Sequence, residues 1–144
     1  MIRLMTEQDL SSSQEVILAA QKGVVYDIEP FLRKCLMEKG ELSLVAEVDG
    51  QVAGVLIGSL LGALGMVDVL AVKPAFQGQG IGLTLVEALT ERVRARGARK
   101  LVVLSWDHSA SFYENLGFHA DPSIHFMSRS IRTSAEPGTV EAQA

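Results

Sequence analysis

The stretch VDVLAVKPAFQGQGIGLTLVEAL, residues 67–89, decides the fold. Its β-branched start predicts a strand over 66–72. After the glycines, apolar residues recur at helical spacing, which predicts a helix over about 80–96 whose apolar side faces a sheet. The chain is therefore expected to contain a strand, a glycine loop and a helix in immediate succession.

The loop between the strand and the helix has glycine at every second position. Gly78, Gly80 and Gly82 lack a Cβ atom, so an anion can approach the backbone closely. The helix that follows points its free N–H groups and the positive end of its dipole into the same loop. Such a terminus favours phosphate. We expect a ligand that carries a diphosphate.

Two common nucleotide signatures do not fit this loop. A Walker A loop ends in Gly-Lys-Ser/Thr, whereas Gly82 is followed by Leu83 and Thr84. The dinucleotide fingerprint requires a third glycine where Leu83 stands, and an acidic residue about 20 residues later that residues 101–105 do not supply. An unrelated phosphate-binding α/β module remains an alternative interpretation. What the loop does fit is the pattern Gln/Arg-x-x-Gly-x-Gly/Ala over 77–82.

A second motif lies downstream, SASFYENLGF at residues 109–118. With both motifs in this order, the chain resembles the GCN5-related N-acetyltransferases (GNAT family) from about residue 42 to 118. The resemblance implies an α/β (α+β) fold: a mixed, mostly antiparallel sheet flanked by helices, with a splayed parallel pair of central strands. It also implies acetyl-CoA as cosubstrate and an N-acetyltransferase that transfers acetyl to a primary amine by direct attack. A non-catalytic CoA-binding regulatory domain of the same fold is the main alternative.

Length and composition are consistent with one globular domain. The 144 residues are 48% hydrophobic and 21% charged. We expect the domain over 1–132 and a disordered tail over 133–144, which is small, polar and contains Pro and Gly. A net charge of −4 argues against nucleic-acid binding. The single Cys35 cannot form an internal disulfide, which is consistent with a reducing cytoplasm, and a buried packing role is the favoured interpretation.

No targeting segment or membrane span is expected. Glu7 and Asp9 interrupt the N-terminus before any apolar run. The uncharged stretch 52–67 is shorter than the roughly 20 residues of a spanning helix and contains four glycines. Two strands with a tight connection explain it better. The connection 61–65 is unusually apolar for a loop, and we expect it to be buried or to form a homodimer contact, although an acceptor pocket is a further alternative.

The sequence pattern predicts the other elements. Asp49-Gly50 is a strong hairpin signal, and the strand over 101–105 is expected to be buried and parallel to the central strand because a helix crosses between them. The remaining expected elements are strands over 1–5, 42–48, 51–60, 119–122 and 124–131 and helices over 6–21, 31–39 and 109–115.

The resemblance also implies the site residues. Backbone groups of the central strand would pair with the pantetheine arm and polarise the thioester, and loop amides would hold the diphosphate. A bulge often separates the two parallel strands in this family. Tyr113 matches the general acid that protonates the departing thiolate, and no metal is implied. The implied cofactor-binding residues are Leu70, Ala71, Val72, Gln77, Gly78, Gln79, Gly80, Ile81 and Gly82.

Two parts of the site have no clear match. The loop lacks the Arg or Lys that the family often carries, so backbone groups would do most of the binding, with Lys73 as one nearby cation. No carboxylate stands on 101–105, where some relatives place a base. The local alternatives are Asp68, Asp107 and His108, or an amine that arrives deprotonated. The acceptor stays open: a protein N-terminus, lysine, amino acid, polyamine or antibiotic amine. Tyr26, Asp27 and Glu29 either touch it or belong to a solvated connector.

Overall fold

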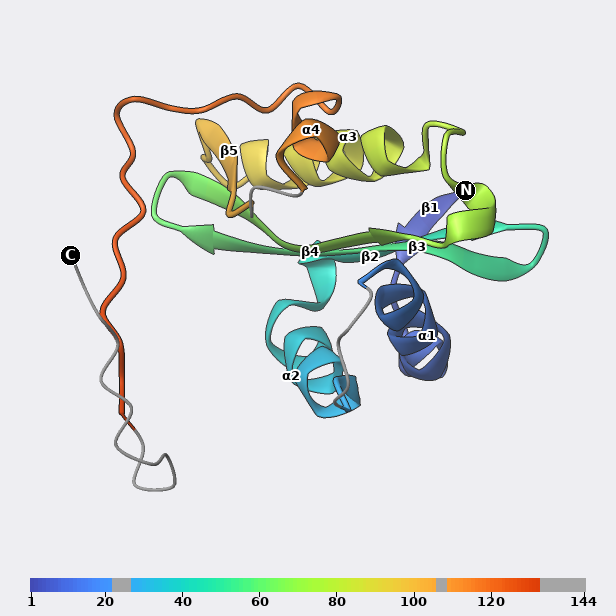
Figure 1. The fold of residues 1–144 in the computed structure, drawn as a ribbon. Helices are drawn as coiled ribbons and strands as arrows, with labels where there is room; N and C mark the ends of the chain where they lie inside the picture. The colour runs from blue at the N-terminus through green and yellow to red at the C-terminus, as the bar shows by residue number, and fades with distance from the viewer. Residues whose placement is uncertain (22–26, 106–108, 133–144) are drawn as a thin grey trace.

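A computed structural model of the protein describes residues 1–21, 27–105 and 109–132. Figure 1 shows a single sheet with helices above and below it. The tail expected to be disordered, 133–144, lies outside the described residues. Among the described helices, none combines the length and apolar character that crossing a bilayer requires.

The sheet has five strands in the order β1-β2-β3-β4-β5. All neighbours are antiparallel except β4 and β5, which are parallel. This confirms the mixed, mostly antiparallel fold with one parallel pair. The strands span Ile2–Leu4 (β1), Ser43–Val48 (β2), Gln51–Leu61 (β3), Leu64–Val72 (β4) and Lys100–Val103 (β5).

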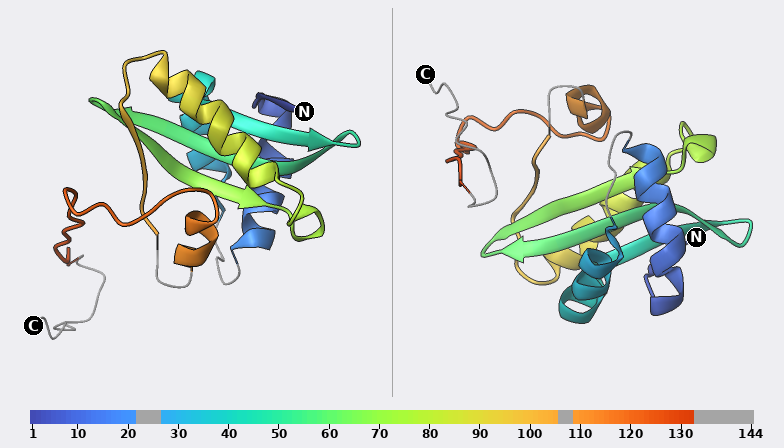
Figure 2. Two further views of the ribbon diagram at one scale, coloured as in Figure 1. Left: turned by 90° about the horizontal axis from the view of Figure 1, so that it is seen from above. Right: turned by 60° about the horizontal axis from the view of Figure 1, so that its bottom comes forward.

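The helices form a layer on each face of the sheet (Figures 1 and 2). On one face lie α1 and α2, and on the other lie α3 and α4. Each layer covers its own hydrophobic cluster, one around Leu32 and Val55 and one around Leu56 and Leu89. The helices span Leu10–Ala20 (α1), Glu29–Lys39 (α2), Ile81–Arg94 (α3) and Ala110–Glu114 (α4), with 3-10 turns at Glu7–Asp9, Gly40–Leu42 and Pro74–Phe76.

Two local predictions are confirmed by the backbone. Asp49 and Gly50 have φ angles of 50° and 76°, the positive values that a two-residue hairpin of this kind requires, and Val48 pairs with Gln51. The helix after the loop buries one apolar side on the sheet, as its spacing indicates. Glycines in the strands allow this close approach: a Cβ at Gly58 would stand 2.5 Å from Leu89 Cδ1.

Three expectations are wrong. Residues 119–122 and 124–131 form no strand, and the chain there runs along the outside with almost every side chain exposed. The connection expected at 61–65 is a two-residue turn, and Leu61 is 66% exposed, so the expectation of burial is wrong, while the homodimer contact stays a prediction. The strand β5 is shorter than expected and only half-buried, because no strand pairs with its outer side within the described residues.

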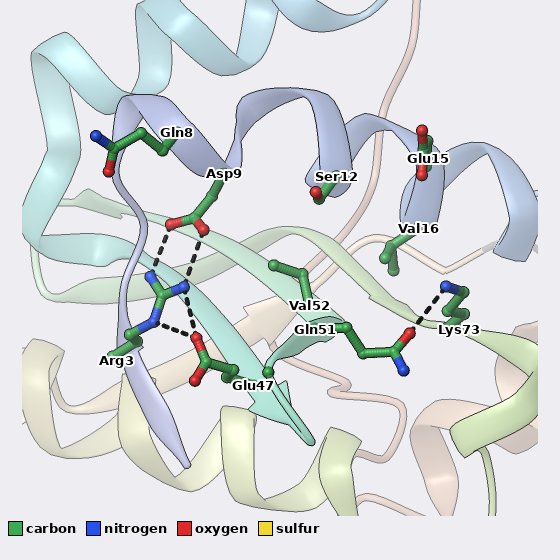
Figure 3. A pocket seen from close by; sticks show the side chains of 11 residues that line it. Arg3, Gln8, Asp9, Ser12, Glu15, Val16, Glu47, Gln51, Val52 and Lys73 are labelled. Carbon is green, nitrogen blue, oxygen red and sulfur yellow. Dashed lines mark hydrogen bonds and ion pairs between the residues drawn. The ribbon is translucent and has the colours of Figure 1, made fainter.

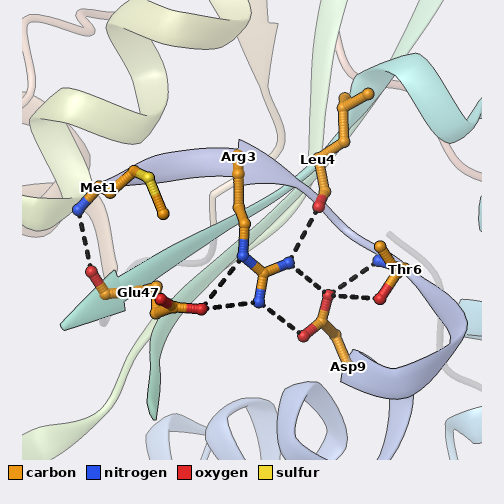
Figure 4. Close-up of polar contacts among 6 residues, drawn as sticks. All are labelled: Met1, Arg3, Leu4, Thr6, Asp9 and Glu47. Carbon is orange, nitrogen blue, oxygen red and sulfur yellow. Dashed lines mark hydrogen bonds and ion pairs between the residues drawn. The ribbon is translucent and has the colours of Figure 1, made fainter. Parts of the chain in front are cut away.

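The start of the chain is held by one arginine (Figure 4). Arg3 Nη1 and Nη2 donate to the two carboxylate oxygens of Asp9 at 2.7 and 2.9 Å, and Nη2 also donates to Glu47 Oε1 at 3.0 Å. Asp9 Oδ2 in turn accepts the backbone N–H of Thr6 at 2.8 Å. This network ties β1, β2 and the entry to α1 together. The hydrogen bonds from Arg3 lower the pKa of the Asp9 carboxyl.

Replacing Asp9 by Asn is expected to destabilise the protein by about 2 kcal/mol, because Arg3 loses a charged partner that is largely out of solvent. A carboxyl whose pKa is lowered by folding contributes stability that is complete above its ordinary pKa of about 3.9. That contribution is lost as the pH falls through the lower pKa of the folded state. Urea titrations should therefore show a difference in the free energy of unfolding between wild type and Asp9→Asn at pH 7. This difference should become smaller in acid.

The matched control is Glu7→Gln. Glu7 pairs with Arg33 at 3.2 Å, but its side chain is 76% exposed, and exposed pairs contribute little. Two results would contradict the role given to the Arg3–Asp9 pair. One is a loss of unfolding free energy in Glu7→Gln as large as in Asp9→Asn, and the other is a loss in Asp9→Asn that does not change with pH.

Candidate active site

The parallel strands β4 and β5 part halfway along β4. Their pairing runs from Leu64 with Lys100 to Val67 with Val103 and extends no further. At the same point the register between β3 and β4 shifts, since Ile57 pairs with Val69 and Gly58 with Val67, which leaves Asp68 as the extra residue of a bulge. The expected splay is therefore present, and a bulge accompanies it.

Beyond the bulge, one side of β4 has no strand partner among the described residues. Lys73 N–H donates to Ala53 O on β3 at 2.8 Å. Because successive residues of a strand direct their backbone groups to opposite sides, Ala71 also faces β3, and Leu70 and Val72 face the opening. Of the three strand residues implied as cofactor ligands, two thus have N–H groups on the open side. The carbonyl of Val72 accepts the Gln77 side-chain amide at 3.0 Å, a contact that the sequence did not predict.

The glycine loop ends beside this opening. Gly78 and Gly80 both have φ of 81°, the left-handed conformation, and Gly80 is the N-cap of α3. The first intrahelical bond is donated by Thr84 N–H to Gly80 O at 3.0 Å. The amides of Ile81, Gly82 and Leu83 therefore have no acceptor within the helix. Residues 77–80 are exposed, and a Cβ at Gly78 or Gly80 would meet nothing within 4 Å.

The helix α4 meets the same loop. A Cβ at Gly82 would lie 3.8 Å from Val72 Cγ2, from Phe112 Cζ and from Leu116 Cδ2. The end of β4, the start of α3 and α4 therefore converge at Gly82, although they are far apart in sequence. The role of Phe112 and Leu116 in this meeting was not predicted, although both stand in the second family motif.

Tyr113 is half-buried on α4. Its ring makes edge-on contacts with Phe112, at 5.1 Å between centroids, and with Phe118, at 5.8 Å. It also packs against the hydrophobic cluster under α3. Burial raises the pKa of the phenol above its ordinary value. The group therefore stays protonated across the neutral range, as a proton donor must.

The structure describes some of the candidate bases and of the residues expected near the acceptor. Asp68 is exposed at the bulge. The pKa of the buried Cys35 thiol is raised, mainly by burial, and the charge of Asp68 adds to this effect. Asp27 accepts the N–H of Glu29 at 3.1 Å, and Glu29 pairs with Arg33 at 3.0 Å, which favours the connector interpretation for both. Tyr26, Asp107 and His108 lie outside the described residues.

A polar cleft lies elsewhere on the molecule, between α1 and the β2–β3 hairpin (Figure 3). Its volume is about 360 Å³. Its two cations already have partners, since Arg3 binds Asp9 and Glu47, and Lys73 Nζ donates to Gln51 Oε1 at 3.2 Å. Lys73 is thus directed into this cleft. Within the described residues, no three His, Cys, Asp or Glu side chains gather as metal ligands would.

The fold and the site define a class: α/β proteins in which a glycine loop at a helix N-terminus stands beside a splayed parallel strand pair. The chain belongs to the acetyltransferase (GNAT) family, whose family model matches residues 8–118. The resemblance seen in the two motifs is therefore confirmed.

Individual relatives agree with this membership. An acetyltransferase of Photorhabdus laumondii is 36% identical over 88 residues, 60% of this chain and 62% of that protein's length. One of Sodalis glossinidius is 32% identical over 108 residues, 73% of this chain and 76% of that protein. The crystal structure of a GNAT family acetyltransferase from Brucella melitensis in complex with acetyl-CoA is 33% identical, with a TM-score of 0.63 over 83% of this chain and 82% of that one.

Proposed function

We propose that the protein transfers the acetyl group of acetyl-CoA to a primary amine by direct attack in a ternary complex. The observation that carries the proposal is the open side of β4 after the bulge. There the backbone groups of Leu70 and Val72 have no strand partner in the part of the chain that the structure describes. The glycine loop and α4 border the same opening. The similar protein that was crystallised with acetyl-CoA supports the choice of cosubstrate.

The chain's residues fit the ends of such a cosubstrate. The amides of Ile81, Gly82 and Leu83, together with the helix dipole, provide donors for a diphosphate. The positive φ angles of Gly78 and Gly80, and the empty space at their Cβ positions, leave room for close approach. Because Gln77 and Gln79 are neutral, the binding energy comes mainly from backbone groups. The N–H groups of Leu70 and Val72, which have no strand partner within the described residues, can pair with the amides of the pantetheine arm.

The same residues divide the chemistry of acetyl transfer. The amine nitrogen attacks the thioester carbonyl carbon, a C–N bond forms, and the C–S bond breaks. A backbone N–H on the open side of β4 stabilises the negative charge that develops on the carbonyl oxygen, a contribution of about 3 kcal/mol in comparable sites. Tyr113 donates its phenolic proton to the departing thiolate. The amine loses one proton to a base or to water.

Asp68 is proposed to accept the proton that the attacking amine loses. It is exposed at the bulge of β4, where the parallel strands part. In this proposal an amine that reaches the opening passes this carboxylate, because the bulge adjoins the point where the strands part. The carboxylate also favours a cationic acceptor, because it attracts the ammonium form before deprotonation.

Replacing Asp68 by Asn is expected to lower kcat/KM for the amine by about 10-fold or more near neutral pH. The loss should shrink as the pH rises toward the amine's own pKa of about 10, because the free amine then needs no base. Acetyl-CoA affinity should not change. A pH–rate profile for both proteins measures this. The control is Asp49→Asn in the β2–β3 turn, which removes one surface charge where Asn tolerates the positive φ.

The proposed function as a whole is tested by ligand binding and by product. Acetyl-CoA, NAD and ATP are compared in a thermal-shift assay, and free thiol is measured with acetyl-CoA and a panel of amines. Stabilisation by acetyl-CoA alone, with amine-dependent thiol release, is expected. Stabilisation without release for any amine would favour the alternative, a CoA-binding regulatory domain of the same fold. No response to acetyl-CoA would contradict both.

A further inference from the structure

The polar cleft between α1 and the β2–β3 hairpin has no role in the proposed acetyl transfer. Its volume of about 360 Å³ lies in the range of sites for small molecules. In Figure 3 the cleft extends from the Arg3–Asp9 pair at one end to Lys73 at the other. Between these ends Val16 and Val52 line it. The cleft therefore has apolar groups in its middle and charged groups at both ends.

The end at Lys73 carries two opposite charges that no described residue neutralises. The Lys73 ammonium has one partner, the neutral side chain of Gln51, at 3.2 Å. Glu15 lines the same end, because α1 runs along the cleft from Asp9 toward Lys73 (Figure 3). No group of the described residues binds the Glu15 carboxylate, and Glu15 forms no ion pair with Lys73 across the cleft. A ligand that carries a carboxylate and an ammonium group one carbon apart can satisfy both charges.

The opposite end of the cleft has an excess of negative charge. Asp9 and Glu47 share a single guanidinium, that of Arg3. All N–H groups of this guanidinium already donate within the protein, so none is left for an anionic ligand. Both bonds from Arg3 to Glu47 go to Oε1, at 3.0 and 3.2 Å. Glu47 Oε2 therefore keeps its capacity to accept a further donor, and this end favours a cation.

We propose that this cleft binds a free amino acid with a cationic side chain, for which L-lysine is the model. Its α-carboxylate binds Lys73, and its α-ammonium binds Glu15. The aliphatic part of its side chain packs on Val16 and Val52, and the terminal ammonium binds Glu47 Oε2. The cleft contains three carboxylates and two cations, so its net negative charge complements the net positive charge of such a ligand.

The proposed site is separate from the candidate active site, and the inference does not rest on the proposed acetyl transfer. Among the lining residues, Lys73 follows directly on the open part of β4, but its N–H donates to Ala53 O on β3, away from the opening. Lys73 O accepts the N–H of Phe76 at 2.8 Å, at the turn that leads to the glycine loop. A bound amino acid would thus contact the residue before this turn without occupying the loop.

The test maps binding of L-lysine on the full chain by NMR of isotope-labelled protein. Amide shifts should change at residues 12–16, 47–52 and 73 and should saturate with one dissociation constant. Three analogues each remove one charge of the ligand. L-lysine methyl ester lacks the carboxylate, Nα-acetyl-L-lysine lacks the α-ammonium, and L-norleucine lacks the charge of the side chain. Each is expected to bind about 10-fold more weakly than L-lysine.

A matched pair of variants tests the protein side. Glu15→Gln should weaken L-lysine binding about 10-fold and leave acetyl-CoA affinity unchanged. The control is Glu38→Gln on α2, which removes an equally exposed type of carboxylate outside the cleft and should bind L-lysine as wild type does. Thermal melting of both variants without ligand checks that neither change affects folding.

Three results would overturn the proposal. The first is the absence of shift changes with L-lysine at millimolar concentrations. The second is an equal loss of affinity in Glu15→Gln and Glu38→Gln, or equal affinity for L-lysine and its methyl ester, since either would indicate a general attraction of cations to an acidic protein. The third is a set of shift changes centred on Asp68, Leu70 and Val72, which would make L-lysine an acceptor at the candidate active site. A failure of acetyl-CoA to bind would contradict the proposed function alone.

Discussion

Replacing Gly82 by Glu is expected to abolish acetyl-CoA binding at the concentrations where wild type saturates. The variant places a carboxylate at the mouth of α3, where the free amides would hold the diphosphate. Juxtaposed like charges cost several kcal/mol, and each 1.4 kcal/mol is a factor of ten in affinity. The dissociation constant should therefore rise about 100-fold or more, which isothermal titration calorimetry measures directly.

The unliganded fold should tolerate this change. A Cβ at Gly82 would stand 3.8 Å from its three nearest atoms, an ordinary contact distance. An acidic side chain in the first turn of a helix also interacts favourably with the helix dipole. Gly80 is a poorer choice, because its φ of 81° would strain any other residue and mix a folding defect with a binding defect.

Two controls separate charge from bulk. Gly82→Ala adds only the Cβ and should keep most of the affinity. Gln has the size of Glu without its charge, so the acetyl-CoA affinity of Gly82→Gln should lie between those of Gly82→Ala and Gly82→Glu. A thermal-shift assay without ligand should give similar melting temperatures for all four proteins. Wild-type affinity in Gly82→Glu would show that the diphosphate does not bind at this helix, and the proposed cosubstrate site would be wrong.

The sequence was sufficient wherever local chemistry decides the structure. Asp49-Gly50 takes the positive φ angles of its turn whatever surrounds it. The helix α3 follows from apolar spacing, and its start follows from a glycine that can adopt the left-handed cap. These features depend on residues close together in the chain, so a pattern can predict them. The candidate phosphate loop belongs to this class, because its glycines and the helix start that follows them are adjacent in the sequence.

Features that depend on distant residues were not predictable in the same way. The place of the bulge at Asp68 depends on the register between two strands, although a charged residue in a run of Val and Leu is a local sign of it. The side-chain bond from Gln77 to Val72 O depends on the path of the loop. A strand was expected over 124–131, yet a strand also needs a neighbour to pair with, and the sequence of the segment does not say whether one is available.

The bulge links the fold to the chemistry. Before it, β4 pairs with β5 and is an ordinary member of the sheet; after it, the backbone of Leu70 and Val72 faces an opening. On its other side the same part of β4 stays paired with β3, from Val69 with Ile57 to Val72 with Gly54. In the proposed reaction this pairing matters, because main-chain donors that are fixed in place require no reorganisation.

Replacing Tyr113 by Phe is expected to lower kcat by at least about 10-fold with little change in acetyl-CoA affinity. Only the hydroxyl group is removed, while the ring that contacts Phe112 and Phe118 stays. Without the donor, the thiolate must leave unprotonated or take a proton from water. The measurement is steady-state thiol release together with calorimetric binding of acetyl-CoA.

The pH dependence distinguishes an acid from a packing residue. A general acid works in its protonated form, and burial raises the pKa of Tyr113 above its ordinary value of about 10. On the alkaline side, wild-type turnover should thus fall only at pH above 10, and the Phe variant should lack that fall. The control Phe118→Leu removes one edge-on ring contact and should lower stability without removing the alkaline limb. If Tyr113→Phe turns over at the wild-type rate, the thiolate is protonated by another group and Tyr113 only packs.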